Sequence, residues 1–267
     1  MIYDLIIIGC GPAGLAAAIY AGRYRMKTLV LGKKLGGQAA IAGKIENYPG
    51  FLSVDGFELI NLMKKQAADL GVETIDAKVD KINHKNHTFE ILAGETKYQA
   101  KAIILALGVK RRHLNLANEK ELTGKGVHYC ITCDGPVYTG KTIAIVGGGD
   151  SSVKGTNLAA EYASKIYLIV LEKKIIAEPF NYEQMMKLGN KVEVLLETEV
   201  KEIIGQDKLE KIILSKEYQG ANELIIDGLF IEIGSVPDIE LTKPLGIELN
   251  EAGYIKVDNM MKTNING

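Results

Sequence analysis

An internal near-repeat constrains the fold of this chain more than any other feature. Residues 6–14 (IIIGCGPAG) and residues 144–152 (AIVGGGDSS) each join an apolar run to a glycine-rich turn. In both copies an alanine-containing helical segment comes next, and a second apolar run follows it. The expected helices are 15–23 and 153–164, and the runs after them are 28–31 and 166–171. Each copy therefore predicts the β-α-β opening of a nucleotide-binding unit.

The glycines of these turns have distinct physical roles. The first lets the chain turn sharply off the strand, the second lets the backbone approach a pyrophosphate at the helix N-terminus, and the third permits close helix-strand packing. The second copy has Ser152 at the third place, which weakens that match. The cofactor-binding candidates of the two turns are Gly9, Gly11, Pro12, Ala13 and Gly14, and Gly147, Gly149, Asp150 and Ser151.

The region between the copies predicts the rest of an α/β domain. Residues 52–70 have helical periodicity, and residues 81–98 alternate as antiparallel strands around an Asn-His turn. Residues 102–108 predict a buried strand that ends in Gly108, and residues 228–234 predict its counterpart in the second unit. We expect an α/β fold of two Rossmann-like three-layer ββα domains, the second inserted into the first.

Composition narrows the class of protein. A chain of 267 residues, 47% hydrophobic and with 29 glycines, is long enough for two α/β domains. A net charge of -1, with no basic run, argues against a nucleic-acid partner. The apolar N-terminus, residues 1–9, is too short for a membrane span and predicts a buried strand. With only three cysteines, we expect a cytoplasmic protein with no membrane partner.

The second informative feature is the segment 129–135 (YCITCDG), ahead of the second glycine turn. Two thiols separated by two residues can close a small disulfide ring, and in such motifs one thiol usually has a lowered pKa. The acid that follows is a candidate to carry the proton. The catalytic candidates are therefore Cys130, Cys133 and Asp134.

Other interpretations of this segment remain open. A zinc site needs four ligands, yet the chain has no second C-x-x-C and no suitably spaced histidine pair. Cys130 and Cys133 as two inert buried thiols, with Asp134 as an ordinary turn residue, are a further alternative. No metal site is predicted. We expect three neighbouring or related residues to serve packing only, namely Cys10, His128 and Tyr129.

Together these motifs resemble the low-molecular-weight thioredoxin reductases, which are flavoprotein disulfide reductases of the pyridine nucleotide family. The resemblance covers nearly the whole chain, and the order of the motifs is its specific part. It rests on GCGPAG (9–14), GGQ (36–38), ENYPG (46–50), ALG (106–108), C-x-x-C-D-G (130–135) and G-x-G (147–149).

The resemblance implies an FAD-binding domain that is split in sequence, and a homodimer. The implied domains are 1–112 for the first part of the FAD domain, 113–239 for the inserted NAD(P)-type domain, and 240–267 for the return segment. By resemblance the first turn lines the FAD pyrophosphate, Gly108 closes the adjoining strand, and Asn47 lies by the isoalloxazine ring. Three further residues approach the middle of the cofactor, namely Gly36, Gly37 and Gln38.

The same resemblance assigns roles to the C-x-x-C segment. Cys133 faces the flavin and accepts its electrons, and Cys130 attacks the disulfide of a thioredoxin-like partner protein. Asp134 serves as general acid and base for the exposed thiolate.

Two departures from the family pattern bear on the electron donor and the cofactor. Relatives that use NADPH have a histidine and paired arginines where this chain has Leu171-Glu172-Lys173-Lys174. Glu172 repels a 2′-phosphate and suits a free ribose diol, about twenty residues beyond the glycines. Lys173 and Lys174 could compensate for that charge, but lysine lacks the flat bidentate fork of arginine. We therefore expect NADH, or another carrier such as ferredoxin, rather than NADPH.

The second departure is at residues 258–267, where the family continues into a strand, an Ala-Gly-Asp turn and a helix. The sequence thus predicts weak FAD retention and low stability. Three functions remain in view: a flavin-dependent disulfide reductase, a ferredoxin- or NADH-driven enzyme of this type, and a redox-inactive FAD- or nucleotide-binding module.

Overall fold

The computed structural model describes residues 1–267 and divides the chain into two compact units. The first unit combines residues 1–110 with residues 236–267, and the second is the continuous segment 111–235. The sequence predicts the crossings slightly later, at 112/113 and 239/240. In the structure the chain passes from one unit to the other within two short strands that pair with each other. Both strands contain polar and apolar residues, so no change of composition marks the boundary. These strands are β9 (Val109–Arg111) and β18 (Ser235–Pro237).

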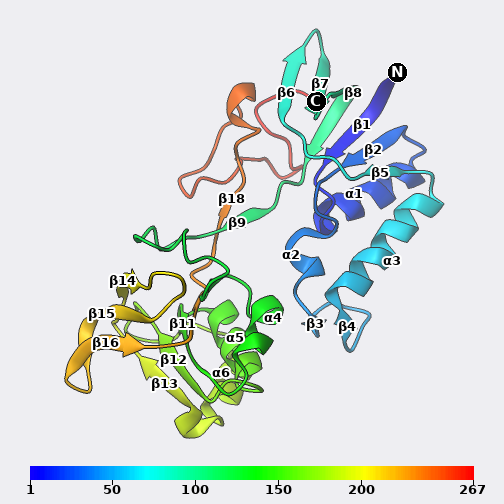
Figure 1. Ribbon diagram of the computed structural model, residues 1–267. Helices are drawn as coiled ribbons and strands as arrows, with labels where there is room; N and C mark the ends of the chain where they lie inside the picture. The colour runs from blue at the N-terminus through cyan, green and yellow to red at the C-terminus, as the bar shows by residue number, and fades with distance from the viewer. The chain divides into compact units, whose positions relative to one another are not determined.

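The first unit is built on a six-stranded sheet with β1 near its centre (Figure 1). Its spatial order is β5 (Glu73–Ile75), β2 (Thr28–Leu31), β1 (Ile2–Ile8), β8 (Thr96–Leu105), β7 (Thr88–Ala93) and β6 (Lys81–Lys85). The first four strands are parallel, and β8, β7 and β6 are antiparallel. Both faces of β1 are covered, which explains why Ile6 and Ile7 are fully buried in a continuous apolar run.

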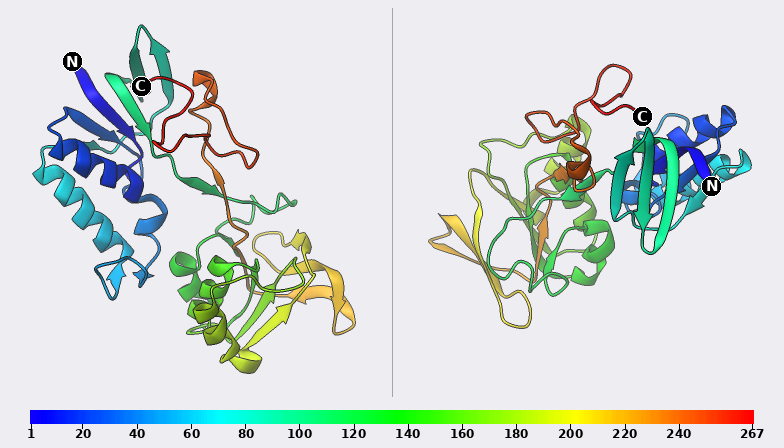
Figure 2. Two further views of the ribbon diagram at one scale, coloured as in Figure 1. Left: turned by 180° about the vertical axis from the view of Figure 1, so that it is seen from behind. Right: turned by 90° about the horizontal axis from the view of Figure 1, so that it is seen from above.

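Helices α1 (Pro12–Arg23) and α3 (Gly56–Asp69) lie side by side in this unit (Figure 2). Leu15 of α1 packs with Ile60 and Met63 of α3. The sequence predicted a helix over 52–70, and its start is wrong by several residues. The Asp55 carboxylate accepts hydrogen bonds from the backbone N–H groups of Phe57 and Glu58 and so begins the helix. The unit also contains β3 (Lys44–Ile45), β4 (Val54–Asp55), α2 (Gly37–Ala40) and the 3-10 helix η3 (Lys243–Leu245).

The second unit is built on a five-stranded parallel sheet. Its spatial order is β10 (Val127–His128), β17 (Gly228–Ile231), β11 (Thr142–Val146), β12 (Lys165–Ile169) and β13 (Val192–Leu195). An antiparallel sheet adds β14 (Val200–Ile204), β15 (Lys211–Tyr218) and β16 (Ala221–Ile225). The helices are α4 (Ile131–Asp134), α5 (Asp150–Ala159), α6 (Pro179–Met186), η1 (Gly135–Tyr138) and η2 (Gly189–Lys191).

The six-stranded sheet of the first unit and the five-stranded sheet of the second, each with its helices, confirm the predicted α/β class. Both glycine turns follow strands that have parallel neighbours on both sides, β1 in one unit and β11 in the other, and each leads into a helix. None of the helices is long and apolar enough to traverse a lipid bilayer.

Candidate redox and nucleotide sites

Cys130 and Cys133 are joined by a disulfide, with their Cα atoms 5.3 Å apart. The four-residue helix α4 begins directly after Cys130, whose Sγ accepts a hydrogen bond from the Cys133 backbone N–H at 3.2 Å. Cys130 is half-buried and Cys133 is exposed. The structure therefore brings the two predicted redox residues together in one tight turn.

Two glycines allow this turn to rest on the body of the second unit. Ile131, which is buried, lies against Gly155 of α5, where an added Cβ would be 2.6 Å from the Ile131 Cδ1 atom. An added Cβ on Gly135 would lie only 1.9 Å from the Tyr162 hydroxyl oxygen. That hydroxyl also donates a hydrogen bond to the Ile131 carbonyl at 3.4 Å. The packing of Ile131 on Gly155 and the hydrogen bond from Tyr162 thus hold the disulfide turn against the rest of the second unit.

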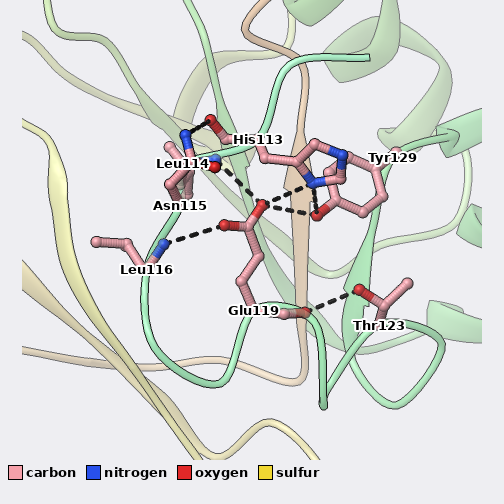
Figure 3. Close-up of polar contacts among 7 residues, drawn as sticks. All are labelled: His113, Leu114, Asn115, Leu116, Glu119, Thr123 and Tyr129. Carbon is pink, nitrogen blue, oxygen red and sulfur yellow. Dashed lines mark hydrogen bonds and ion pairs between the residues drawn. The ribbon is translucent and has the colours of Figure 1, made fainter. Parts of the chain in front are cut away.

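The segment that leads into the disulfide is organised around the buried carboxylate of Glu119 (Figure 3). It accepts hydrogen bonds from the Tyr129 hydroxyl at 2.6 Å and from the backbone N–H groups of Leu114 and Leu116 at 3.1 and 3.2 Å. His113 Nδ1 lies 3.3 Å from the same carboxylate and 2.8 Å from the Tyr129 hydroxyl. Because Tyr129 immediately precedes Cys130, this cluster fixes the approach to the redox turn.

The ionisation of this cluster follows from its contacts. Burial acts to raise the pKa of Glu119, but hydrogen bonds from Tyr129 and the backbone outweigh it and lower that pKa below its ordinary value. Burial, followed by the contact with Glu119, raises the pKa of Tyr129 well above that of a free tyrosine. Glu119 is a structural acid that sequence reasoning missed, since no pattern distinguishes it within the polar segment 110–126.

Asp134, the predicted proton carrier, adjoins both the redox turn and a buried histidine. Its backbone N–H donates to the Cys130 carbonyl at 3.0 Å, and its Oδ2 atom lies 3.1 Å from Nδ1 of His128. The sequence predicted that His128 serves packing only. The structure does bury it, yet also places its ring against the Asp134 carboxylate.

The first glycine turn fits a pyrophosphate. An added Cβ on Gly9 would lie 2.0 Å from the Ala106 carbonyl oxygen, and one on Gly14 would lie 1.9 Å from the Gly9 carbonyl oxygen. An added Cβ on Gly11 would meet a single atom within 4 Å, the Gly36 carbonyl oxygen at 3.8 Å. Two glycines therefore allow close packing, and the third leaves open space above the backbone.

The helix that follows this turn supplies the matching electrostatics. Helix α1 begins at Pro12, has no capping side chain and has no acidic residue in its first turn. Its free backbone N–H groups and positive dipole end suit an anion. Ala13 lies in that same first turn and is exposed. The residues present thus fit the pyrophosphate of the predicted FAD.

The other predicted FAD residues differ in whether they contact the first glycine turn. The Gly36 backbone N–H donates to the Cys10 carbonyl at 2.8 Å, which brings this glycine to the first turn. Gly37 and Gln38 are exposed in α2. Asn47 is exposed just after β3, where its side chain has no hydrogen bond to the turn, and Gly108, with φ +69°, lies beyond the end of β8. Only the first of these is therefore tied to the glycine turn by a contact.

The second glycine turn repeats the backbone of the first. An added Cβ on Gly147 would lie 2.3 Å from the Glu232 carbonyl oxygen, whereas one on Gly149 would meet only the Ile176 carbonyl oxygen at 4.0 Å. Ser152 takes the place of the third glycine, where it is fully buried and its hydroxyl donates to the Gly149 carbonyl at 2.8 Å. A small polar residue therefore satisfies this position.

Acidic side chains distinguish the second turn. Asp150 opens α5, and its carboxylate accepts a hydrogen bond from the Glu178 backbone N–H. Glu172 is exposed, and its Oε2 atom lies 3.3 Å from the point that a Cβ on Gly148 would occupy. Ser151 is exposed beside Asp150. The predicted ribose-binding acid is thus at the turn, while the Asp150 carboxylate is engaged by the protein backbone.

The third thiol is not part of either redox or nucleotide chemistry in this geometry. Cys10 is buried, its Sγ donates to the Lys34 carbonyl at 3.1 Å, and burial raises the pKa of its thiol. An added Cβ on Gly32 would lie 2.5 Å from that sulfur, which agrees with a packing role. No group of three or more His, Cys, Asp or Glu side chains is arranged to hold a metal ion.

Comparison with known proteins covers the same residues. The family model described as "Pyridine nucleotide-disulphide oxidoreductase" matches residues 3–267. A thioredoxin reductase of Bacillus subtilis is 38% identical over 100% of this chain and 84% of its own length. The "34.2 kDa protein in rubredoxin operon" of Clostridium pasteurianum is 39% identical over 99% of this chain and 86% of its own.

A solved structure agrees with these sequence matches. The thioredoxin reductase of Lactococcus lactis superposes with a TM-score of 0.93 and 33% identity, covering 98% of this chain and 87% of that one. The matched residues take in both glycine turns and the disulfide turn that precedes the second.

Proposed function

We propose an electron path for this chain on the premise that it belongs to the pyridine nucleotide-disulphide oxidoreductase family. It is a flavin-dependent disulfide reductase of the thioredoxin reductase type. Family membership implies FAD and a pyridine nucleotide as cofactors. In our proposal, two electrons reach the Cys130–Cys133 disulfide through FAD and pass to a disulfide of a thioredoxin-like protein. The disulfide-bonded turn itself is the observation that carries this assignment.

The reaction divides into steps that balance in atoms and electrons. Bound FAD supplies a reversible two-electron carrier. Two electrons break the Cys130–Cys133 bond, and the two sulfur atoms take up two protons to become thiols. After loss of its proton to Asp134, Cys130 attacks one sulfur of the partner's disulfide, which forms a mixed disulfide and releases the other partner sulfur as a thiolate. Cys133 then attacks the Cys130 sulfur, which closes the ring and releases the second partner sulfur. The proton held by Asp134 and the proton of Cys133 pass to the two partner sulfurs, so the partner leaves as a dithiol.

The chain's own residues set the geometry for these steps. The first glycine turn and the N-terminus of α1 would hold the FAD pyrophosphate, with Gly36, Gly37 and Gln38 toward the middle of the cofactor. Asn47 is assigned to the isoalloxazine ring by family resemblance. Glu119 and Tyr129 hold the approach to Cys130, so that the sulfur is presented in a fixed position.

Two serine substitutions test the order of attack. In Cys133→Ser, Cys130 attacks the partner but the ring cannot close, so we expect a covalent adduct with thioredoxin on a non-reducing gel. In Cys130→Ser we expect no such adduct and no turnover, with flavin reduction intact. An adduct in Cys130→Ser but not in Cys133→Ser would mean that Cys133 attacks the partner and Cys130 closes the ring. A wild-type protein that exchanges no disulfide with thioredoxin would indicate a redox-inactive binding module.

A second candidate concerns the electron donor. Glu172 and Asp150 place negative charge at the second glycine turn, which opposes the 2′-phosphate of NADPH. We therefore propose NADH as donor, with reduced ferredoxin as the alternative. Anaerobic addition of NADPH, NADH and reduced ferredoxin in turn identifies the donor by which one bleaches the flavin. Rapid bleaching by NADPH would contradict this part of the proposal.

A cytoplasmic homodimer completes the proposal. The small number of cysteines supports the compartment, and the family resemblance supports the dimer. Sedimentation of the purified protein tests the dimer, and a monomer at all concentrations would contradict it.

A further inference from the structure

A buried histidine links the carboxylate of Asp134 to an aromatic cluster in the second unit. His128 lies on the short strand β10, opposite Phe230 of β17, and is 7% exposed. Its ring stacks on that of Phe230, with centroids 5.2 Å apart and planes 24° from parallel. Tyr138 packs edge-on against both rings. The position of the imidazole is therefore set by the sheet and by its ring neighbours.

Both nitrogens of this imidazole have polar partners. Nδ1 lies 3.1 Å from Oδ2 of Asp134, and Nε2 lies 2.7 Å from the hydroxyl oxygen of Tyr138. Because a carboxylate only accepts hydrogens, Nδ1 carries its hydrogen toward Asp134. In the neutral imidazole Nε2 is then an acceptor, and the Tyr138 hydroxyl donates to it. Burial, followed by the charges of Asp134 and Asp227, raises the pKa of Tyr138, so its hydroxyl keeps its proton.

We propose that His128 is a positioning residue for the proton chemistry of Asp134. Its imidazole engages one carboxylate oxygen, Oδ2, and leaves Oδ1 to exchange a proton with the thiol of the reduced pair. Tyr138 fixes the tautomer that this requires. The inference rests on the proposed function, since it assigns a partner to the acid and base of that reaction.

No other donor replaces His128 at this carboxylate. The charged groups that surround the imidazole and Tyr138 are Asp134, Asp227 and Lys141. Asp227 accepts from the Thr142 backbone N–H at 2.9 Å, and the Lys141 ammonium lies over the Tyr138 ring, 5.4 Å from its centroid. Loss of the imidazole therefore leaves the Asp134 carboxylate with one partner fewer, and no longer held in this orientation.

The test measures thiol exchange in the full chain without a protein partner. The Cys130–Cys133 disulfide is reduced with dithiothreitol, the reductant is removed anaerobically, and the chromogenic disulfide dithiobis(nitrobenzoate) is added from about pH 5 to about pH 9. Cys130 attacks the probe and Cys133 closes the ring, which releases two nitrothiobenzoate anions per disulfide formed. In His128→Leu we expect exchange near neutrality to be about tenfold slower, because the imidazole no longer orients the Asp134 carboxylate.

Three further variants separate positioning from packing. His128→Asn keeps a donor near the place of Nδ1 and should restore the wild-type profile. Tyr138→Phe keeps the ring but not the hydroxyl that fixes the tautomer, and should slow exchange by about threefold. This variant also serves if His128→Leu does not fold. His84→Asn, in the first unit and stacked on Phe89, is the matched control and should change nothing.

The outcomes are distinct. If the wild-type protein exchanges and the His128 and Tyr138 variants have the same pH–rate profile as the wild-type protein, the positioning role is overturned and the proposed function stands. A wild-type protein without exchange would overturn the proposed function and this inference with it.

Discussion

The two glycine turns of this chain have the same backbone and opposite electrostatics. In each, the first glycine lies close to a carbonyl oxygen just after a neighbouring strand. An added Cβ would lie 2.0 Å from that oxygen at Gly9 and 2.3 Å from it at Gly147. In each, the second glycine has open space above it. Yet α1 has no acidic residue in its first turn, whereas α5 begins with Asp150 and has Glu172 beside its turn.

This difference separates what the fold requires from what a ligand requires. The close contacts recur because a helix must pack on a parallel sheet in both units. The charges are not required by that packing: the N-terminus of α1 has no acid to offset its positive dipole end, whereas α5 begins with Asp150. Both turns thus have the backbone that a pyrophosphate needs, and only the second has acidic side chains beside it.

Exchanging the third residues of the two turns should have the largest effect. In Gly14→Ser the new Cβ would lie 1.9 Å from the Gly9 carbonyl oxygen, and the backbone would have to move. We expect the free energy of unfolding to fall by about 3 kcal/mol or more, with loss of bound flavin. The reciprocal Ser152→Gly loses one hydrogen bond and should cost about 1 kcal/mol. Urea unfolding followed by circular dichroism measures both, and equal costs would mean that the two turns pack alike.

Reversing the charge beside the second turn should have the next largest effect. Glu172→Arg replaces a repulsive carboxylate by a guanidinium that can bind a phosphate through two hydrogen bonds. We expect the ratio of the NADPH to the NADH dissociation constant to fall by about tenfold or more. Glu172→Gln removes the charge without adding the donors and should fall between. Fluorescence titration gives the constants, and an unchanged ratio in the arginine variant would show that a 2′-phosphate does not reach this residue.

Removing the acid from α5 should have the smallest effect. Asp150→Ala removes the acceptor for the Glu178 backbone N–H and should lower the free energy of unfolding by about 1 kcal/mol. Asp150→Asn keeps an acceptor and should cost less. If instead nucleotide affinity changed more than stability, Asp150 would face the ligand rather than the backbone of the loop before α6.

Sequence patterns predicted those parts of the molecule that depend on local order. The glycine turns, the antiparallel hairpin and the C-x-x-C ring all follow from residues close together in the chain. The Asn86–His87 turn is an example, since both residues adopt positive φ, as a two-residue hairpin requires. The start of α3 was missed because Asp55 caps the helix inside a region of apolar periodicity.

The contacts around the redox turn depend on long-range packing and were not predictable. His128 meets Asp134 only because β10 pairs with β17, whose residues lie about a hundred positions further along the chain. Glu119 is buried only because the polar segment that contains it folds so that the backbone N–H groups of Leu114 and Leu116 donate to its carboxylate. The hydrogen bond from the Glu178 backbone N–H to the Asp150 carboxylate is a further contact that local sequence does not predict.

The contact between Ile131 and Gly155 has a consequence for how this architecture changes over time. The helix that starts at the second glycine turn is also the surface on which the disulfide turn rests. A lineage that stopped using a nicotinamide donor would still be selected to keep that helix, and with it the glycines that let the helix start. Glycines at this turn would therefore persist whether or not a nicotinamide binds, so the side chains around them, not the glycines, report on the donor.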